Sequence, residues 1–180
     1  MRRKHLEHRI RTCLSLASLS PCVRRKFGCV VVDPKANVIL SEGYNGNLRG
    51  GSELCGGDTC KRDGLEPGTN YDIGCVHAEQ NAVYNAARLG TSLVGSWFII
   101  NGEPCKLCAK AIVQVGAERV ICISGTFGKL DGVDILRSSG VKVIPVKQDM
   151  SDLSQALDRR LVIKAAPVAD IPTSPFALPT

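Results

Sequence analysis

Aromatic side chains are scarce in this sequence, where they occupy only 4% of the 180 positions. Proteins that bind single-stranded nucleic acid stack the bases on such side chains, so the scarcity argues against that kind of platform. Long apolar runs are missing too: no stretch reaches the length of about 18 residues that a membrane-spanning helix needs. The basic segment 1–11 leads into a stretch interrupted by charges, whereas a signal peptide needs an unbroken apolar core. We therefore expect an intracellular, cytoplasmic protein.

Positive charge exceeds negative charge, with 23 Lys and Arg against 17 Asp and Glu and a formal net charge of +6. The basic residues gather in segments 1–11 and 24–26 and do not follow a whole face. A solvated terminus or a small phosphate site explains this clustering as well as a nucleic acid partner does. The net charge alone therefore decides between none of these.

The apolar pattern predicts a single α/β domain over residues 1–164, followed by a proline-rich tail at 165–180. Helical spacing predicts a first helix over 5–19, and two β-branched runs at 27–33 and 38–45 predict a hairpin. The remaining expected elements are a helix over 77–90, a strand over 96–100, a helix over 104–116, a strand over 119–124, a helix over 131–140, a strand over 141–146 and a helix over 151–162. This order implies a mixed five-stranded sheet with helices on both faces.

Histidine is also scarce, and His77 is the only one of three that lies beyond residue 8. Nine cysteines accompany it, and in a reducing compartment they are thiols or thiolates. Cys105 and Cys108, in "PCKLC", stand three apart at an expected helix start, so both sulfurs project from one face. Unpaired N–H groups and the positive end of the helix dipole favour the thiolate form there. Two thiolates are half of a tetrahedral zinc site.

His77 is the natural third ligand, because it also begins an expected helix and has Glu79 two residues further on. Three protein ligands leave one corner of the tetrahedron for water, and Glu79 then reaches that water as a proton shuttle. The two motifs together fit H-x-E…P-C-x-x-C, the signature of zinc nucleobase deaminases. A C-x-x-C pair alone also occurs in structural zinc sites and redox pairs. A purely structural zinc would, however, leave the carboxylate of Glu79 without a purpose.

Four segments, 27–33, 42–51, 77–90 and 103–121, resemble the deoxycytidylate (dCMP) deaminases of bacteria and their phages. The resemblance covers about residues 7–146, and "GYNG" followed by "RGG" is its most discriminating part. It implies a three-layer α/β/α cytidine-deaminase-like fold and the hydrolysis of dCMP to dUMP, the precursor of thymidylate. Zinc-bound hydroxide would attack the ring carbon that carries the amino group, with Glu79 moving the protons.

The resemblance also implies a set of substrate-binding residues. Asn45 matches an asparagine that contacts the sugar, although it could equally be a turn residue in an Asn-Gly bend. Arg24 and Arg25 stand where the family has basic residues before the first strand, and arginine suits phosphate; a solvated charge run is the alternative. Ala78, between His77 and Glu79, completes the set.

Regulation and assembly enter through the same resemblance. In this family the "GYNG" loop can bind dCTP as activator and dTTP as inhibitor, with Mg²⁺, at the interfaces of a homo-oligomer, either a hexamer or a dimer. The residues that carry this expectation are Gly43, Tyr44, Asn45 and Gly46.

Two departures from the family pattern concern the base pocket. Asn101 and Gly102 replace a Thr-Leu-like lead into the proline-cysteine pair, and Phe127 stands where a tyrosine is usual. They leave open an alternative substrate, either a modified cytosine nucleotide or cytosine or adenine in a polynucleotide.

The loop over 46–75 has no periodicity and needs something to organise it. It contains Cys55, Cys60 and Cys75, and Cys22 lies just before the first expected strand. The resemblance implies that these four thiols form a second, structural zinc site, and ordinary reduced thiols are the alternative. Cys13, Cys29 and Cys122 fall in apolar runs and are expected in the core.

Overall fold

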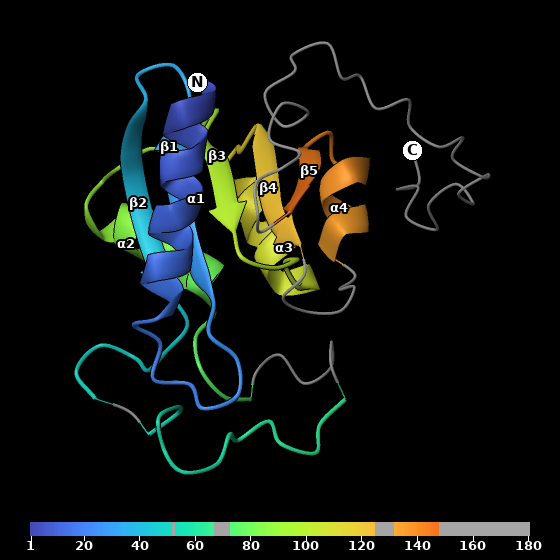
Figure 1. The fold of residues 1–180 in the computed structure, drawn as a ribbon. Helices are drawn as coiled ribbons and strands as arrows, with labels where there is room; N and C mark the ends of the chain where they lie inside the picture. Colours follow the sequence, from blue (N-terminus) through green and yellow to red (C-terminus); the bar gives the residue numbers. More distant parts are fainter. Residues whose placement is uncertain (52, 67–72, 125–131, 148–180) are drawn as a thin grey trace, which may run out of the picture.

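The computed structural model describes residues 1–51, 53–66, 73–124 and 132–147 (Figure 1). The helix expected over 151–162, the tail over 165–180 and Phe127 lie outside these ranges. Among the described residues, no helix combines the length and the apolar character that crossing a membrane requires.

The predicted mixed five-stranded sheet is confirmed, with strand order β2-β1-β3-β4-β5. Strand β1 pairs antiparallel with β2 and β3, whereas β3, β4 and β5 run parallel. The elements are α1 (Arg3–Ala17), β1 (Gly28–Asp33), β2 (Val38–Tyr44), α2 (Ala78–Arg88), β3 (Trp97–Ile100), α3 (Lys106–Gln114), β4 (Arg119–Ser124), α4 (Gly132–Ser138) and β5 (Lys142–Lys147).

Helices cover both faces of the sheet, so the expected three layers are present. Figure 1 shows α1 in front of the sheet and α2 and α3 behind it. The α1 side buries Leu6 and Ile10 against Ile99, and the α2–α3 side buries Ala82 and Ile112 in a separate cluster. Alternation along each strand supplies both cores, because successive side chains point to opposite faces.

Two glycines let the helices approach the sheet closely. A Cβ atom at Gly28 would overlap the carbonyl oxygen of Cys13 in α1, and one at Gly43 would overlap that of Ala78 in α2. Gly43 therefore has a packing reason to be glycine, independent of any effector. The contact also brings the end of β2 against the beginning of α2.

Helices α2 and α3 both begin at the end of the sheet where β2 and β3 finish. The long loop lies beyond that same end in Figure 1, and the pairing of Gly46 with Val76 closes it at its base. In sheets with parallel strands, sites form at this edge, because loops and helix N-termini meet there.

Candidate active site

Two helix N-termini face one another at this edge. His77 is the N-cap of α2 and Cys105 the N-cap of α3, and both have extended backbones. The sequence places Pro104 inside the first turn of a helix, but α3 begins only at Lys106, because Cys105 turns out of the helical path. The Oε1 atom of Gln80 accepts a hydrogen bond from the backbone N–H of His77 at 3.0 Å, which fixes the backbone where α2 begins. The two caps thus direct their side chains toward a common point.

The side chains of His77, Cys105 and Cys108 meet at that point. Nδ1 of His77 lies 3.5 Å from Sγ of Cys105 and 3.4 Å from Sγ of Cys108. Zinc bonds of about 2.0 Å to nitrogen and 2.3 Å to sulfur at tetrahedral angles would separate such atoms by about 3.5 Å. Among the described residues, this trio is the group whose ligand atoms all lie within 4.8 Å of one another. Both the donor atoms and their spacing fit zinc.

Hydrogen bonding within the trio prepares it for a metal. A hydrogen bond from the Cys108 thiol, with a further one from His77, lowers the pKa of Cys105 to about 4. Burial lowers the pKa of His77, but its bond to Cys105 and the charge of Glu79 outweigh burial and leave the pKa raised. These interactions favour the thiolate form of Cys105, which is the form that a metal binds.

Glu79 stands beside this trio in the first turn of α2 and is only 6% exposed. Burial raises the pKa of its carboxyl group, against the opposing effect of His77. A carboxyl group whose pKa is moved toward neutrality can both accept and release a proton, as acid–base catalysis requires.

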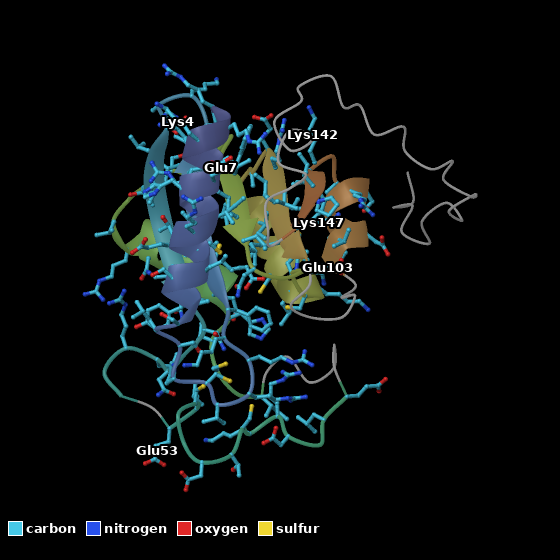
Figure 2. All side chains as sticks on the ribbon, in the orientation of Figure 1. Lys4, Glu7, Glu53, Glu103, Lys142 and Lys147 are labelled. Atoms are coloured by element: carbon cyan, nitrogen blue, oxygen red, sulfur yellow. The ribbon has the colours of Figure 1, made fainter. Side chains whose placement is uncertain are left out.

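One pocket contains the trio's exposed side and most of the other predicted residues. The predicted substrate residues that line it are Asn45, Arg24 and Arg25. Ala78 is not part of the lining and is fully buried at the beginning of α2. The lining also includes Phe27, Arg62, Leu65 and Glu103. Figure 2 shows Glu103 at the sheet end that faces the loop, and Lys4 and Lys142 at the opposite end.

Two buried asparagines hold segment 25–28, of which Arg25 and Phe27 line the pocket. Asn45 accepts the N–H of Phe27 at 2.7 Å and donates to the carbonyl of Arg25 at 2.9 Å. Asn101 accepts the N–H of Gly28 at 2.7 Å and donates to the carbonyl of Lys26 at 3.0 Å. These two hydrogen bonds give Asn101 a structural role in holding the chain that leads into β1, which explains this departure from the family pattern.

Arg24 is engaged with the loop. Its Nη1 donates to the carbonyl of Arg62 at 2.6 Å, and its Nε lies 3.7 Å from Oδ1 of Asp63. The guanidinium group thereby ties the segment before β1 to the loop that closes the pocket.

The three loop cysteines and Cys22 lie near one another. The interactions of Cys55 with Cys22 and Cys75, and of Cys60 with Cys22, shift the pKa values of these thiols. Burial raises the pKa of Cys22, but the backbone N–H groups of Arg25 and Arg24 and these thiols lower it overall. The cluster is looser than the His77 trio, since no three of its sulfurs form a group within 4.8 Å.

The residues of "GYNG" separate in the structure. Gly43, Tyr44 and Gly46 line an outer groove together with Leu19 and other side chains, whereas Asn45 turns into the candidate active site. Neighbouring side chains of an extended segment point in opposite directions, which explains why Tyr44 faces the groove and Asn45 faces the candidate active site.

Comparison with known proteins decides the family. The model of the cytidine and deoxycytidylate deaminase zinc-binding region matches residues 3–124. The chain belongs to this family. The matched residues include the trio, Glu79 and the pocket wall.

Several relatives of this family member carry more specific names. The deoxycytidylate deaminase of Schizosaccharomyces pombe is 30% identical over 132 residues, which are 71% of this chain and 39% of the relative. That of Enterobacteria phage T4 is 38% identical over 81 residues, which are 44% of this chain and 42% of the relative. This chain therefore matches less than half the length of these two relatives. The dCMP deaminase of cyanophage S-TIM5, solved with dCMP and dUMP, is 31% identical and has a TM-score of 0.65 over 81% of this chain and 99% of that one.

Sequence reasoning missed Arg62, Leu65, Phe27 and Glu103. Glu103 adjoins the "PCKLC" motif, and its position there was the available signal. Arg62 and Leu65 lie in the aperiodic loop, where no pattern indicates which side chains turn toward the pocket.

Proposed function

We propose that this chain is a zinc-dependent hydrolase that converts dCMP to dUMP. The observation that carries the proposal is a single pocket in which a His–Cys–Cys trio, the buried carboxyl group of Glu79 and several arginines meet. The trio fits a metal, the carboxyl group fits proton transfer and the arginines fit a phosphate. The names of the relatives from yeast and phage support the same substrate.

In the proposed reaction, His77, Cys105 and Cys108 hold zinc, which when bound supplies Lewis-acid chemistry and lowers the pKa of water toward about 7. Water forms a bond to the ring carbon that carries the amino group, and the carbon–nitrogen bond then breaks to release ammonia. Glu79 accepts one proton of the water and passes it to the ring nitrogen. It then accepts the remaining proton of the added hydroxyl group, as the new carbonyl bond forms, and delivers it to the leaving amino group. Its position in the first helical turn keeps the carboxylate beside the trio.

The direct test is the conversion of dCMP to dUMP by the purified protein, followed by chromatography. We expect turnover of dCMP with little action on cytidine, because the arginines recognise a phosphate that cytidine lacks. Turnover of a 5-substituted dCMP or of cytosine in an oligonucleotide, without turnover of dCMP, would overturn the proposed substrate.

We also propose that Cys22, Cys55, Cys60 and Cys75 bind a second zinc ion that organises the loop. Four thiolates are a common donor set of structural zinc, and these thiols lie near enough to shift one another's pKa values. Closing around a metal would bring the four sulfurs nearer to one another and hold the loop against the segment before β1.

Metal content tests this second site. We expect two zinc ions per chain in the wild type and one in the double variant Cys55→Ser, Cys60→Ser, by mass spectrometry of the native protein. Cys122→Ala, a buried cysteine outside both clusters, serves as control and should keep both ions. A double variant with the same zinc content as the wild type would contradict the assignment.

The cytoplasmic location, the homo-oligomer and regulation by dCTP or dTTP with Mg²⁺ stay predictions. The groove that contains Tyr44, which is 37% exposed, is the surface on which a partner copy or effector would be sought.

A further inference from the structure

Arg62 belongs to the loop but lines the same pocket as His77, Glu79 and Cys105. It lies between the loop's two ends, far in sequence from the arginines that precede β1.

The side chain of Arg62 is held in place along its length. Its Nη1 donates to the carbonyl of Ile73 at 3.2 Å. A Cβ atom at Gly74 would lie only 3.1 Å from Cγ of Arg62, so the aliphatic part crosses directly over this glycine. Gly74 also has φ of +94°, a conformation that side chains other than glycine rarely adopt. The backbone just before His77 is thus shaped to seat this side chain.

The main chain of Arg62 is fixed as well. Arg24 donates to its carbonyl at 2.6 Å and lies 3.7 Å from the carboxylate of Asp63. Asp63 in turn accepts the N–H of Cys60 at 2.9 Å, which closes a tight turn. Because Arg24 uses its guanidinium on this turn, its part in the pocket is to hold the loop.

We propose that Arg62 binds the phosphate monoester of the nucleotide substrate and that Arg24 is the positioning residue that orients it. This inference rests on the proposed function and assigns a residue that the sequence pattern did not indicate. Arginine presents five N–H donors on a planar group, which suits it to the several oxygens of a phosphate. Its seat over Gly74 reduces the entropy lost when the substrate binds.

A comparison of dCMP with deoxycytidine, which lacks the phosphate, distinguishes phosphate binding by Arg62 from a purely structural role. For Arg62→Gln we expect kcat/KM for dCMP to fall about 10- to 100-fold, the value of one or two charge-assisted hydrogen bonds. For deoxycytidine, kcat/KM should stay within about threefold, since it has no phosphate to lose. Arg62→Lys should recover part of the loss, because the charge returns without the planar donors. Inhibition by dUMP should weaken in parallel, and inhibition by deoxyuridine should not.

A double-mutant cycle tests the part of Arg24. Arg24→Gln should lower kcat/KM for dCMP, yet add little in the Arg62→Gln background, because it acts through Arg62. If the losses in kcat/KM from the two single variants multiplied in the double variant, Arg24 would act independently of Arg62 and its positioning role would be wrong. Arg88→Gln, an exposed arginine at the end of α2, is the matched control and should change nothing.

Two results would overturn the role of Arg62 while leaving the proposed function intact. They are an equal loss with dCMP and deoxycytidine, or no loss with dCMP. A wild type that does not deaminate dCMP would instead refute the proposed function, and the two failures are therefore distinguishable.

Discussion

Replacing Glu79 with glutamine is expected to lower kcat for dCMP by about 10²- to 10⁴-fold while zinc stays bound. Glutamine has the size of glutamate, so it fills the same buried position at the beginning of α2. Its amide cannot accept the proton of water or return one to the leaving amino group. Glu79 is not a member of the trio of metal ligands, so the loss should be confined to proton transfer.

The measurement pairs steady-state kinetics with zinc content and a thermal melt. Glu118→Gln is the control, because its carboxylate is partly exposed at the opposite end of the sheet, before β4. It should leave kcat unchanged. Loss of zinc from Glu79→Gln would show that the carboxylate is a ligand and that its assigned role is wrong.

Replacing Cys108 with alanine is expected to remove the catalytic zinc and all measurable turnover. The residue is fully buried and its sulfur lies 3.4 Å from Nδ1 of His77, so no water can easily replace it. Only two ligands would remain, and we expect the zinc affinity to fall by more than about 100-fold, since loss of even an outer partner costs about 10- to 100-fold. The free energy of unfolding should decrease too, because metal bound only by the folded state stabilises it.

Native mass spectrometry of Cys108→Ala should find one zinc ion fewer per chain than in the wild type. A chelator should lower the melting temperature of the variant less than that of the wild type, because this site no longer holds zinc. The control is again Cys122→Ala, which removes a buried thiol of the apolar core that is not a member of the trio. If Cys108→Ala retained the full zinc content, the trio would not be the metal centre.

The fold was predictable to within a few residues because periodicity reports burial directly. The β-branched run before Asp33 became β1, and helical spacing after His77 became α2. Helix starts were less accurate. The sequence places His77 and Pro104 within first turns, whereas N-capping gives His77 and Cys105 extended backbones. A pattern of side chains cannot distinguish a cap from a first turn, because both lie on the same face.

The sequence by itself predicted the candidate site of this protein: a histidine, a nearby glutamate and two cysteines at two helix starts, with a strand between them in the chain. Residue types and their spacing are local properties, so they can be read directly from the sequence. Only the tertiary structure showed three further contacts. Asn101 hydrogen-bonds to the backbone that leads into β1, Arg24 hydrogen-bonds to the loop, and the side chain of Arg62 crosses Gly74 beside the pocket. Such roles depend on contacts between segments that are distant in the chain. In an aperiodic loop, no sequence pattern predicts which side chains make these contacts.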